Sequence, residues 1–222
     1  MSMASTIASH CRSPQSGPSK SGTNLLPRVT IRAVLAVFLL ALPVLLSGVA
    51  SAGEAETRDA REFFFTQTFG DLPEEMQTAR EQGKLGMLLF FEADACPYCQ
   101  YMLRKVFSQK RVQDWYQERF VSIAVDIHGD VELKDFDGIT LPSKIFSDHR
   151  RIFLTPVISF VDLDGNEIYR HLGMLKTADE FLLLGEYIEG KHYYRIEFKT
   201  FAKARGLQNE DEILITPHAD SE

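Results

Sequence analysis

The stretch that most constrains the fold is LGMLLFFEADACPYCQ, residues 85–100, in which an apolar run leads into two cysteines three positions apart. Residues 85–92 are almost continuously apolar, and a run of this length without alternation predicts a central strand covered on both faces. From Pro97 onward, apolar residues recur at helical spacing. The sequence therefore predicts a strand, a short bend and a helix, with Cys96 and Cys99 where the helix begins.

The first 52 residues differ from the rest of the chain and predict a targeting segment. Residues 1–27 are polar and contain no acidic side chain, two arginines precede the apolar run 33–46, and the small-x-small sequence ASA follows at 50–52. This arrangement is typical of a secretory signal, so we expect cleavage after Ala52 and export, in a bacterium to the periplasm. The alternative is an anchor in the inner membrane formed by residues 33–49, a stretch only just long enough to cross a bilayer.

The charge of the remaining chain argues against a polyanionic partner. Residues 1–52 hold four of the 24 basic residues and none of the 31 acidic ones, which leaves 20 basic against 31 acidic residues and a net charge of −11. A domain with this excess of acid repels nucleic acid. We therefore expect no nucleic-acid partner, and contact with a membrane only through the N-terminal segment if that segment stays uncleaved.

Cysteine number narrows the interpretation of the pair. Cys11 lies in the predicted targeting segment, so Cys96 and Cys99 are the only cysteines expected in the mature protein. A single pair is not a disulfide framework, which needs several pairs at scattered positions. A chain of this length can also bury a core large enough to fold without a disulfide bond. The pair is therefore expected to serve chemistry rather than stability.

The rest of the chain predicts one α/β domain over residues 53–205, followed by an acidic tail without regular structure at 206–222. Thr140 is the expected N-cap of one helix, and Thr177 with Glu180 forms a capping box at the start of another. The predicted order is a mixed sheet of about four strands flanked by helices on both faces. Helices are expected at 74–84, 97–120 with a break near Ser108, 141–152, 177–190 and 191–205, and strands at 85–92, 120–127, 156–162 and 167–173.

Cys96 is the better candidate for a reactive thiol. It directly precedes the helix, where free N–H groups and the helix dipole stabilise a thiolate, and Pro97 suits the first helical position. Cys99 lies one turn further on and can close a small ring with Cys96, so Cys96 is expected to attack a substrate disulfide and Cys99 to resolve the product. Glu92 and Asp94 would oppose this thiolate if their carboxylates lie close to it.

Two other interpretations of the pair remain open. A structural zinc site needs four ligands, and no histidine of the mature chain stands at ligand spacing to another. We therefore expect no bound metal, although two thiolates alone suit a copper(I)-binding or metal-delivery module. An inert disulfide in a non-catalytic interaction module is the third possibility. A strand followed by Cys-x-x-Cys and a helix in an α/β pattern favours redox chemistry.

Three motifs resemble the thioredoxin superfamily, and within it the exported thioredoxin-related proteins of the SoxW type. They are FFEADACPYC, FDG before a short helix, and FLTPVISFVDLDGNEIYRHLG at 153–173, and the resemblance covers about residues 60–190. The resemblance implies a thioredoxin-like fold and a protein-disulfide reductase without a cofactor. It also implies protein thiols and disulfides as substrates and a membrane thiol as electron donor.

The resemblance also implies roles for residues outside the cysteine pair. Pro156 would form a cis peptide bond, and the backbone of Thr155 would pair with the substrate chain. Pro97 and Tyr98, between the cysteines, would contact the substrate. Their identity is common in glutaredoxins.

The sequence departs from many thioredoxins at two positions. Phe90 stands where those proteins bury an aspartate, and Ala95 stands where they carry a tryptophan. Glu92 is therefore the nearest candidate carboxylate for proton transfer to Cys99.

Overall fold

The structure is a computed structural model that describes residues 56–207. The targeting segment predicted at 1–52 and nearly all of the tail predicted at 206–222 lie outside these residues, so both stay predictions. Among residues 56–207, no helix is long and apolar enough to cross a membrane.

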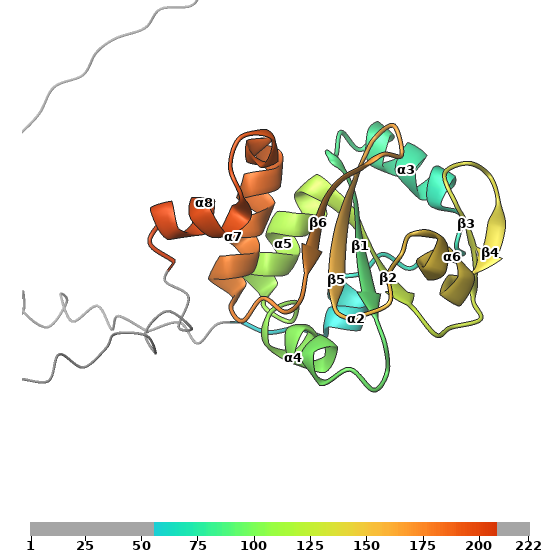
Figure 1. The fold of residues 1–222 in the computed structure, drawn as a ribbon, viewed down its shortest axis with the longest axis horizontal. Helices are drawn as coiled ribbons and strands as arrows, with labels where there is room; N and C mark the ends of the chain where they lie inside the picture. The colour runs from blue at the N-terminus through green and yellow to red at the C-terminus, as the bar shows by residue number, and fades with distance from the viewer. Residues whose placement is uncertain (1–55, 208–222) are drawn as a thin grey trace, which may run out of the picture. The chain divides into compact units, whose positions relative to one another are not determined.

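A four-stranded mixed sheet lies at the centre of the domain (Figure 1). Strand β1 pairs in parallel with β2 and antiparallel with β5, and β5 and β6 form a hairpin closed by an Asp-Gly turn. Every residue of β1 is buried, as its unbroken apolar run predicts. The predicted sheet is thus confirmed, with strands β1 (Gly86–Glu92), β2 (Phe120–Asp126), β5 (Val157–Asp162) and β6 (Glu167–Leu172) in the order β2-β1-β5-β6.

Helices cover both faces of this sheet (Figure 1). One side carries α3 (Leu72–Glu81) and α6 (Ser143–His149), and the other carries α5 (Lys110–Arg119) and α7 (Ala178–Glu189), with α4 (Pro97–Lys105) leading into α5. Adjacent residues of β1 reach the two layers. The Phe90 ring lies 4.9 Å from that of Phe107, and the Phe91 ring lies 6.1 Å from that of Phe146 in α6. The predicted α/β sandwich is confirmed.

The segment before α6 differs from the prediction. Two short unpredicted strands, β3 (Glu132–Lys134) and β4 (Thr140–Pro142), pair across the DFDG turn. Thr140 therefore lies in a strand and is not an N-cap. Helix α6 begins at Ser143 without a side-chain cap, because the backbone N–H of Ser143 already donates to the carbonyl of Val131 at 2.8 Å.

Other helix boundaries differ in ways that follow from local hydrogen bonds. Helix α3 begins two residues early, because the Asp71 carboxylate accepts the N–H of Glu74 at 3.0 Å and caps it. Thr177 caps α7 as predicted, but the Glu180 carboxylate accepts the N–H of Lys176. The helix predicted at 191–205 is instead a 3-10 turn, η2 (His192–Tyr194), followed by α8 (Phe198–Ala204).

The N-terminal segment, residues 56–65, is fastened across the junction between α4 and α5. The N–H of Arg58 donates to the carbonyl of Ser108 at 2.8 Å, and the Arg58 guanidinium binds Asp114 at 2.9 Å. The short helix α2 (Ala60–Phe63) follows, capped by Asp59. This path brings Arg61 to the end of β1.

An aromatic layer covers β6 and α7 from the C-terminal side. We define it as Tyr187 of α7, His171 of β6, and Phe198 and Phe201 of α8. The Tyr187 ring lies 5.4 Å from that of Phe198 and 5.3 Å from that of Phe201, and the His171 ring lies 5.9 Å from that of Phe198. Helix α8 thus extends the core beyond the sheet and its covering helices.

Candidate functional site

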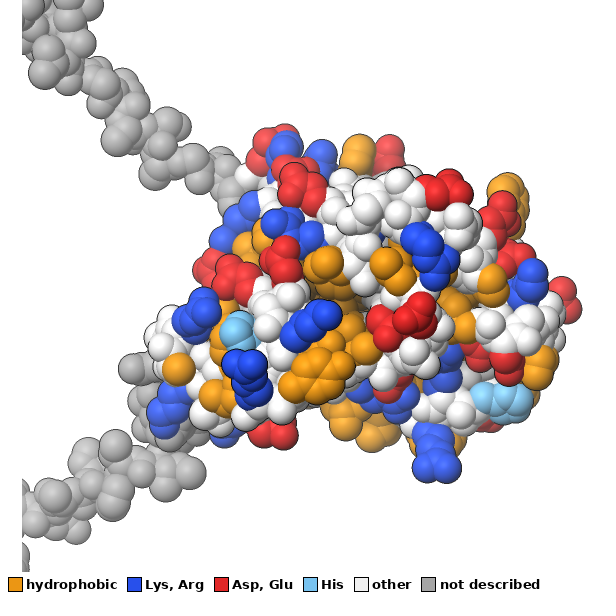
Figure 2. All heavy atoms as spheres, turned by 90° about the horizontal axis from the view of Figure 1, so that it is seen from above, with side chains coloured by type: hydrophobic (Ala, Val, Ile, Leu, Met, Phe, Trp, Pro, Cys, Tyr) orange, Lys and Arg blue, Asp and Glu red, His pale blue; other side chains and the backbone are white. Residues whose placement is uncertain are grey.

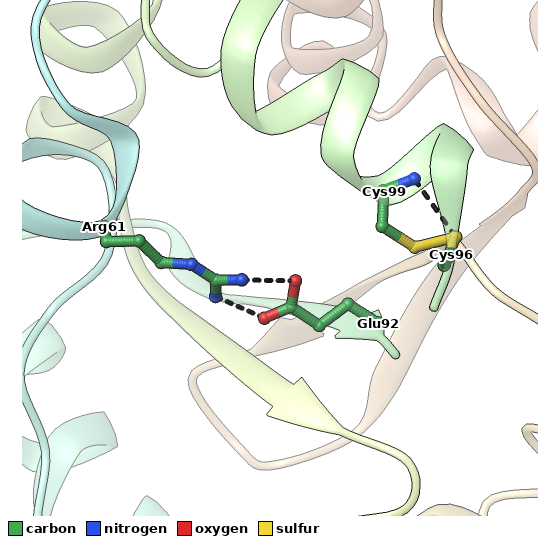
Figure 3. Close-up of a disulfide and its surroundings, with 4 residues drawn as sticks. All are labelled: Arg61, Glu92, Cys96 and Cys99. Carbon is green, nitrogen blue, oxygen red and sulfur yellow. Dashed lines mark hydrogen bonds and ion pairs between the residues drawn. A yellow bond between two sulfur atoms is a disulfide. The ribbon is translucent and has the colours of Figure 1, made fainter. Parts of the chain in front are cut away.

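Cys96 and Cys99 form a disulfide at the N-terminus of α4 (Figure 3). Cys96 is the N-cap residue, and its Sγ accepts the backbone N–H of Cys99 at 3.1 Å. Pro97 occupies the first turn, where its missing N–H leaves no partner unsatisfied. In the reduced protein, the same N–H and the helix dipole would stabilise a thiolate on Cys96.

The two cysteines differ in accessibility. Cys96 is 7% exposed, whereas Cys99 is fully buried. Cys96 is therefore the more accessible of the two residues. The roles of Cys96 as the attacking thiol and of Cys99 as the resolving one stay predictions.

The topology of the sheet brings the Thr155–Pro156 segment to the cysteines. Strand β5 runs antiparallel to β1 with Phe91 opposite Val157, so the start of β5 lies beside the end of β1 that leads to Cys96. The Thr155–Pro156 peptide bond is cis. Both residues and Tyr98 line one groove of about 390 Å³, whereas Pro97 is exposed and is not among its lining residues.

The rim of this groove is apolar and open to solvent. Leu154 is 81% exposed, Leu172 71% and Tyr98 58%, and all three line the groove together with Met174. Exposed apolar surface of this kind is typical of interaction sites and ligand-binding grooves. The opposite end of the domain, seen from above in Figure 2, carries acidic and basic side chains around a central apolar patch.

Glu92 points away from the cysteines and toward Arg61 (Figure 3). The carboxylate is buried and makes a two-pronged ion pair with the guanidinium, in which Arg61 Nη2 lies 2.7 Å from Glu92 Oε2. The hydrogen bond to Glu92 raises the pKa of Arg61, and the charges of Asp94 and Asp59 add to this effect. The role of Glu92 in proton transfer to Cys99 stays a prediction. Its carboxylate is already bound to the Arg61 guanidinium.

Phe90, which stands where many thioredoxins bury an aspartate, is part of the aromatic core. Phe90 is fully buried, and its ring lies 5.9 Å from that of Phe65. No group of three or more His, Cys, Asp or Glu side chains that could hold a metal ion occurs within residues 56–207.

Sequence reasoning missed Arg61 and the groove residues Leu154, Leu172 and Met174. Arg61 stands in a segment without clear periodicity, and nothing in its spacing pairs it with Glu92. Leu154 directly precedes the Thr-Pro pair, so its place in the sequence was the one signal that could have identified it as a groove residue. The structure adds that its side chain is exposed.

The pattern of the thioredoxin-like domain family matches residues 72–189, more than half of the chain. A thioredoxin-fold protein from Helicobacter pylori is similar in structure, with a TM-score of 0.50, 21% identity, and coverage of 65% of this chain and 93% of that chain. A thioredoxin from Thermus thermophilus has a TM-score of 0.41 and 26% identity over 52% of this chain and 82% of that chain. No curated protein matches the chain. The chain belongs to the thioredoxin-like domain family and has the thioredoxin-like α/β fold.

Proposed function

We propose that this protein is an exported thiol–disulfide oxidoreductase that acts on protein substrates through Cys96 and Cys99. The observation that carries the proposal is the position of Cys96, whose sulfur accepts an N–H at the N-terminus of α4. Tyr98, two residues further on, lines a groove together with Thr155 and Pro156. Membership of the thioredoxin-like family supports it. The exposed apolar rim favours a polypeptide substrate over a small hydrophilic thiol.

The proposed order of exchange rests on the greater exposure of Cys96 than of Cys99. The Cys96 thiolate attacks one sulfur of a substrate disulfide, which forms a mixed disulfide and releases the other substrate sulfur as a thiolate. The Cys99 thiolate then attacks Cys96 Sγ, which closes the Cys96–Cys99 disulfide and releases the second substrate thiolate. Two electrons pass to the substrate, and solvent protonates the released thiolates according to their pKa values. The closed disulfide in the structure is the oxidised end of this cycle.

The groove supplies the positions that a substrate chain would occupy. We propose that the backbone of Thr155 pairs with an extended substrate segment beside Pro156, while Tyr98 and Pro97 contact the substrate next to Cys96. Thr155, Pro156 and Tyr98 line the groove, and Pro97 is exposed at the start of α4, which supports this assignment.

In the cell we propose a reductant of the SoxW type in the periplasm. Each reduced substrate leaves the protein oxidised, so a dithiol must return two electrons, and a membrane thiol donor would do so. The signal-like composition of residues 1–52 supports export.

Trapping of the first covalent step tests the proposal. The reduced Cys99→Ser variant, mixed with insulin, is expected to accumulate a mixed disulfide that dithiothreitol reduces. Cys96 can still attack insulin, but the variant has no second thiol to release the product. The wild type should accelerate insulin reduction. The matched control is a Cys96→Ser/Cys99→Ser variant, which should trap nothing. Absence of both trapping and insulin reduction would contradict the proposed exchange.

Equilibration of the pair with glutathione tests the direction of electron flow. A reductant is expected to have a potential near that of thioredoxin, about −270 mV. A value near about −120 mV would instead identify an oxidant and contradict the proposed direction.

A further inference from the structure

The ion pair between Arg61 and Glu92 lies at the end of β1, four residues before the reactive cysteine. The Glu92 side chain is 9% exposed and binds Arg61 through both carboxylate oxygens. A buried ion pair contributes little net stability compared with apolar side chains of similar size. Its position at the end of the strand that leads to Cys96 therefore suggests a role in the chemistry of the thiol.

Few charged groups face the loop that carries Cys96. Its own residues contribute the carboxylates of Glu92 and Asp94, and α2 contributes the Arg61 guanidinium. The adjacent strand β2 ends in Asp126, which is paired with Glu92 in the sheet. The first turn of α4 contains no acidic residue, and the groove lining contains no acid or base apart from the Tyr98 phenol. On the loop before β5, Arg150 is already bound to Asp135 at 2.7 Å, and Arg151 is exposed to solvent. Arg61 is thus the cation that faces both carboxylates of the loop.

We propose that Arg61 is a positioning residue that sets the acidity of the Cys96 thiol by holding the Glu92 carboxylate away from the sulfur and cancelling its charge. The N-terminus of α4 then stabilises the Cys96 thiolate without opposition from that carboxylate. The inference rests on the proposed function only for its effect on exchange, because thiol acidity can be measured without any substrate. Arg61 lies outside the residues that match the family model, 72–189.

The two partners of the ion pair should act in opposite directions. Arg61→Met leaves the Glu92 carboxylate uncompensated and should raise the pKa of the Cys96 thiol. Glu92→Gln leaves the guanidinium uncompensated and should lower that pKa. The double variant removes both charges and should return the pKa close to that of the wild type.

The rate of alkylation of the reduced full-length protein by iodoacetamide, followed at Cys96 by mass spectrometry from pH 4 to pH 9, measures this acidity. A nearby charge shifts a pKa by about one unit or more, so Arg61→Met should slow alkylation below the thiol pKa about tenfold. Glu92→Gln should move the midpoint of the profile to lower pH, and the double variant should alkylate within about twofold of the wild type.

Arg58→Met is the matched control, because Arg58 belongs to the same segment and its ion pair with Asp114 at 2.9 Å holds α5 instead of the cysteine loop. Its alkylation profile should equal that of the wild type. Arg61→Lys keeps the charge and should also stay close to the wild type. The isosteric Glu92→Gln serves as the test if Arg61→Met fails to fold.

An unchanged midpoint in Glu92→Gln, or shifts of the same sign in Arg61→Met and Glu92→Gln, would overturn the inference. Either result would show that the pair only supports the structure. Failure of the trapping experiment with Cys99→Ser would leave these alkylation profiles unaffected, so the two proposals can fail separately.

Discussion

The cysteine end of the sheet and the aromatic layer use apolar side chains in opposite ways. Beside the disulfide, Leu154 and Leu172 are 81% and 71% exposed around an open groove. Over β6 and α7, Phe198 and Phe201 are only 7% and 6% exposed. Apolar surface that stays in water contributes nothing to the stability of the free protein, whereas buried rings contribute several kilocalories per mole. If the groove binds substrates as proposed, binding and stability reside in different regions of the domain.

The aromatic layer also lies partly outside the part of the chain that defines the family. The family match ends at residue 189, and α8 begins at Phe198. Helix α8 thus contributes part of the layer from beyond the matched residues and thickens one flank of the domain. If the division between the two regions is real, substitutions in each should affect one property and spare the other.

Loss of the reactive sulfur should break the chemistry and leave the fold intact. Cys96→Ser is expected to lower insulin reduction to the uncatalysed rate, because no thiolate remains within reach of a substrate. Serine is a good N-cap, so α4 should keep its first turn. Activity assays and thermal unfolding measure the two effects. A parallel collapse of the unfolding transition would show that the cysteine end also carries stability.

The parts of the fold that depend on neighbouring residues could be predicted from the sequence. The apolar run before Cys96 specifies a buried strand, and the cysteine spacing places both sulfurs in the first turn of a helix. Thr177 directly caps the helix that it precedes. Local hydrogen bonding and periodicity decide each of these features, so they do not require knowledge of the rest of the molecule.

The parts that depend on distant residues could not be predicted in the same way. Arg61 and Glu92 are 31 positions apart, and the segment that carries Arg61 shows no periodic pattern. Leu154 and Leu172 meet only because β5 and β6 form a hairpin. Thr140 has the chemistry of an N-cap, but pairing with β3 places it in a strand. Tertiary context overrides local preference at each of these positions.

Removal of a ring from the aromatic layer should cost stability and spare the chemistry. Phe201→Ala deletes a buried ring that lies 5.3 Å from that of Tyr187 and 4.6 Å from that of His192. The free energy of unfolding should fall by about 3 kcal/mol. Urea unfolding measures the loss, and insulin reduction at 25 °C should stay within about twofold of the wild type. A large fall in activity while the protein is still folded would contradict the division between the regions.

The aromatic layer should also make stability depend on pH. Burial lowers the pKa of His171 from its ordinary 6.5 to about 4. Between pH 6.5 and pH 4 the unfolded chain therefore binds the proton more readily than the folded protein does. The free energy of unfolding should decrease as the pH is lowered through this window. It should not change through this group above or below that window. After allowance for partial exposure, the total loss is on the order of 2 kcal/mol.

His171→Gln provides the comparison for this pH effect. The variant cannot take up the proton, so its unfolding midpoint in urea should fall less than that of the wild type between pH 7.5 and pH 4.5. Carboxylates titrate in both proteins, and the difference between the two curves isolates the histidine. Identical curves would mean that His171 titrates normally and is not held neutral by the layer.

The smallest expected effect concerns the rim of the groove and separates binding from chemistry. Leu154→Ala should change the free energy of unfolding by less than about 0.5 kcal/mol, because the side chain is already 81% exposed. It should lower kcat/KM for insulin about fivefold, the equivalent of about 1 kcal/mol of lost apolar contact in the complex. Reduction of a small aromatic disulfide, which cannot span the groove, should not change.

Ile139→Ala is the matched control for the rim, because Ile139 is also exposed, at 52%, but lies in the turn before β4 and outside the groove lining. It should leave both substrates unaffected. An equal loss with insulin and the small disulfide in Leu154→Ala would mean that Leu154 affects the cysteines themselves. The exposed apolar rim would then act on the reactivity of the cysteines and not on substrate binding. It would differ from the aromatic layer only in its exposure to solvent.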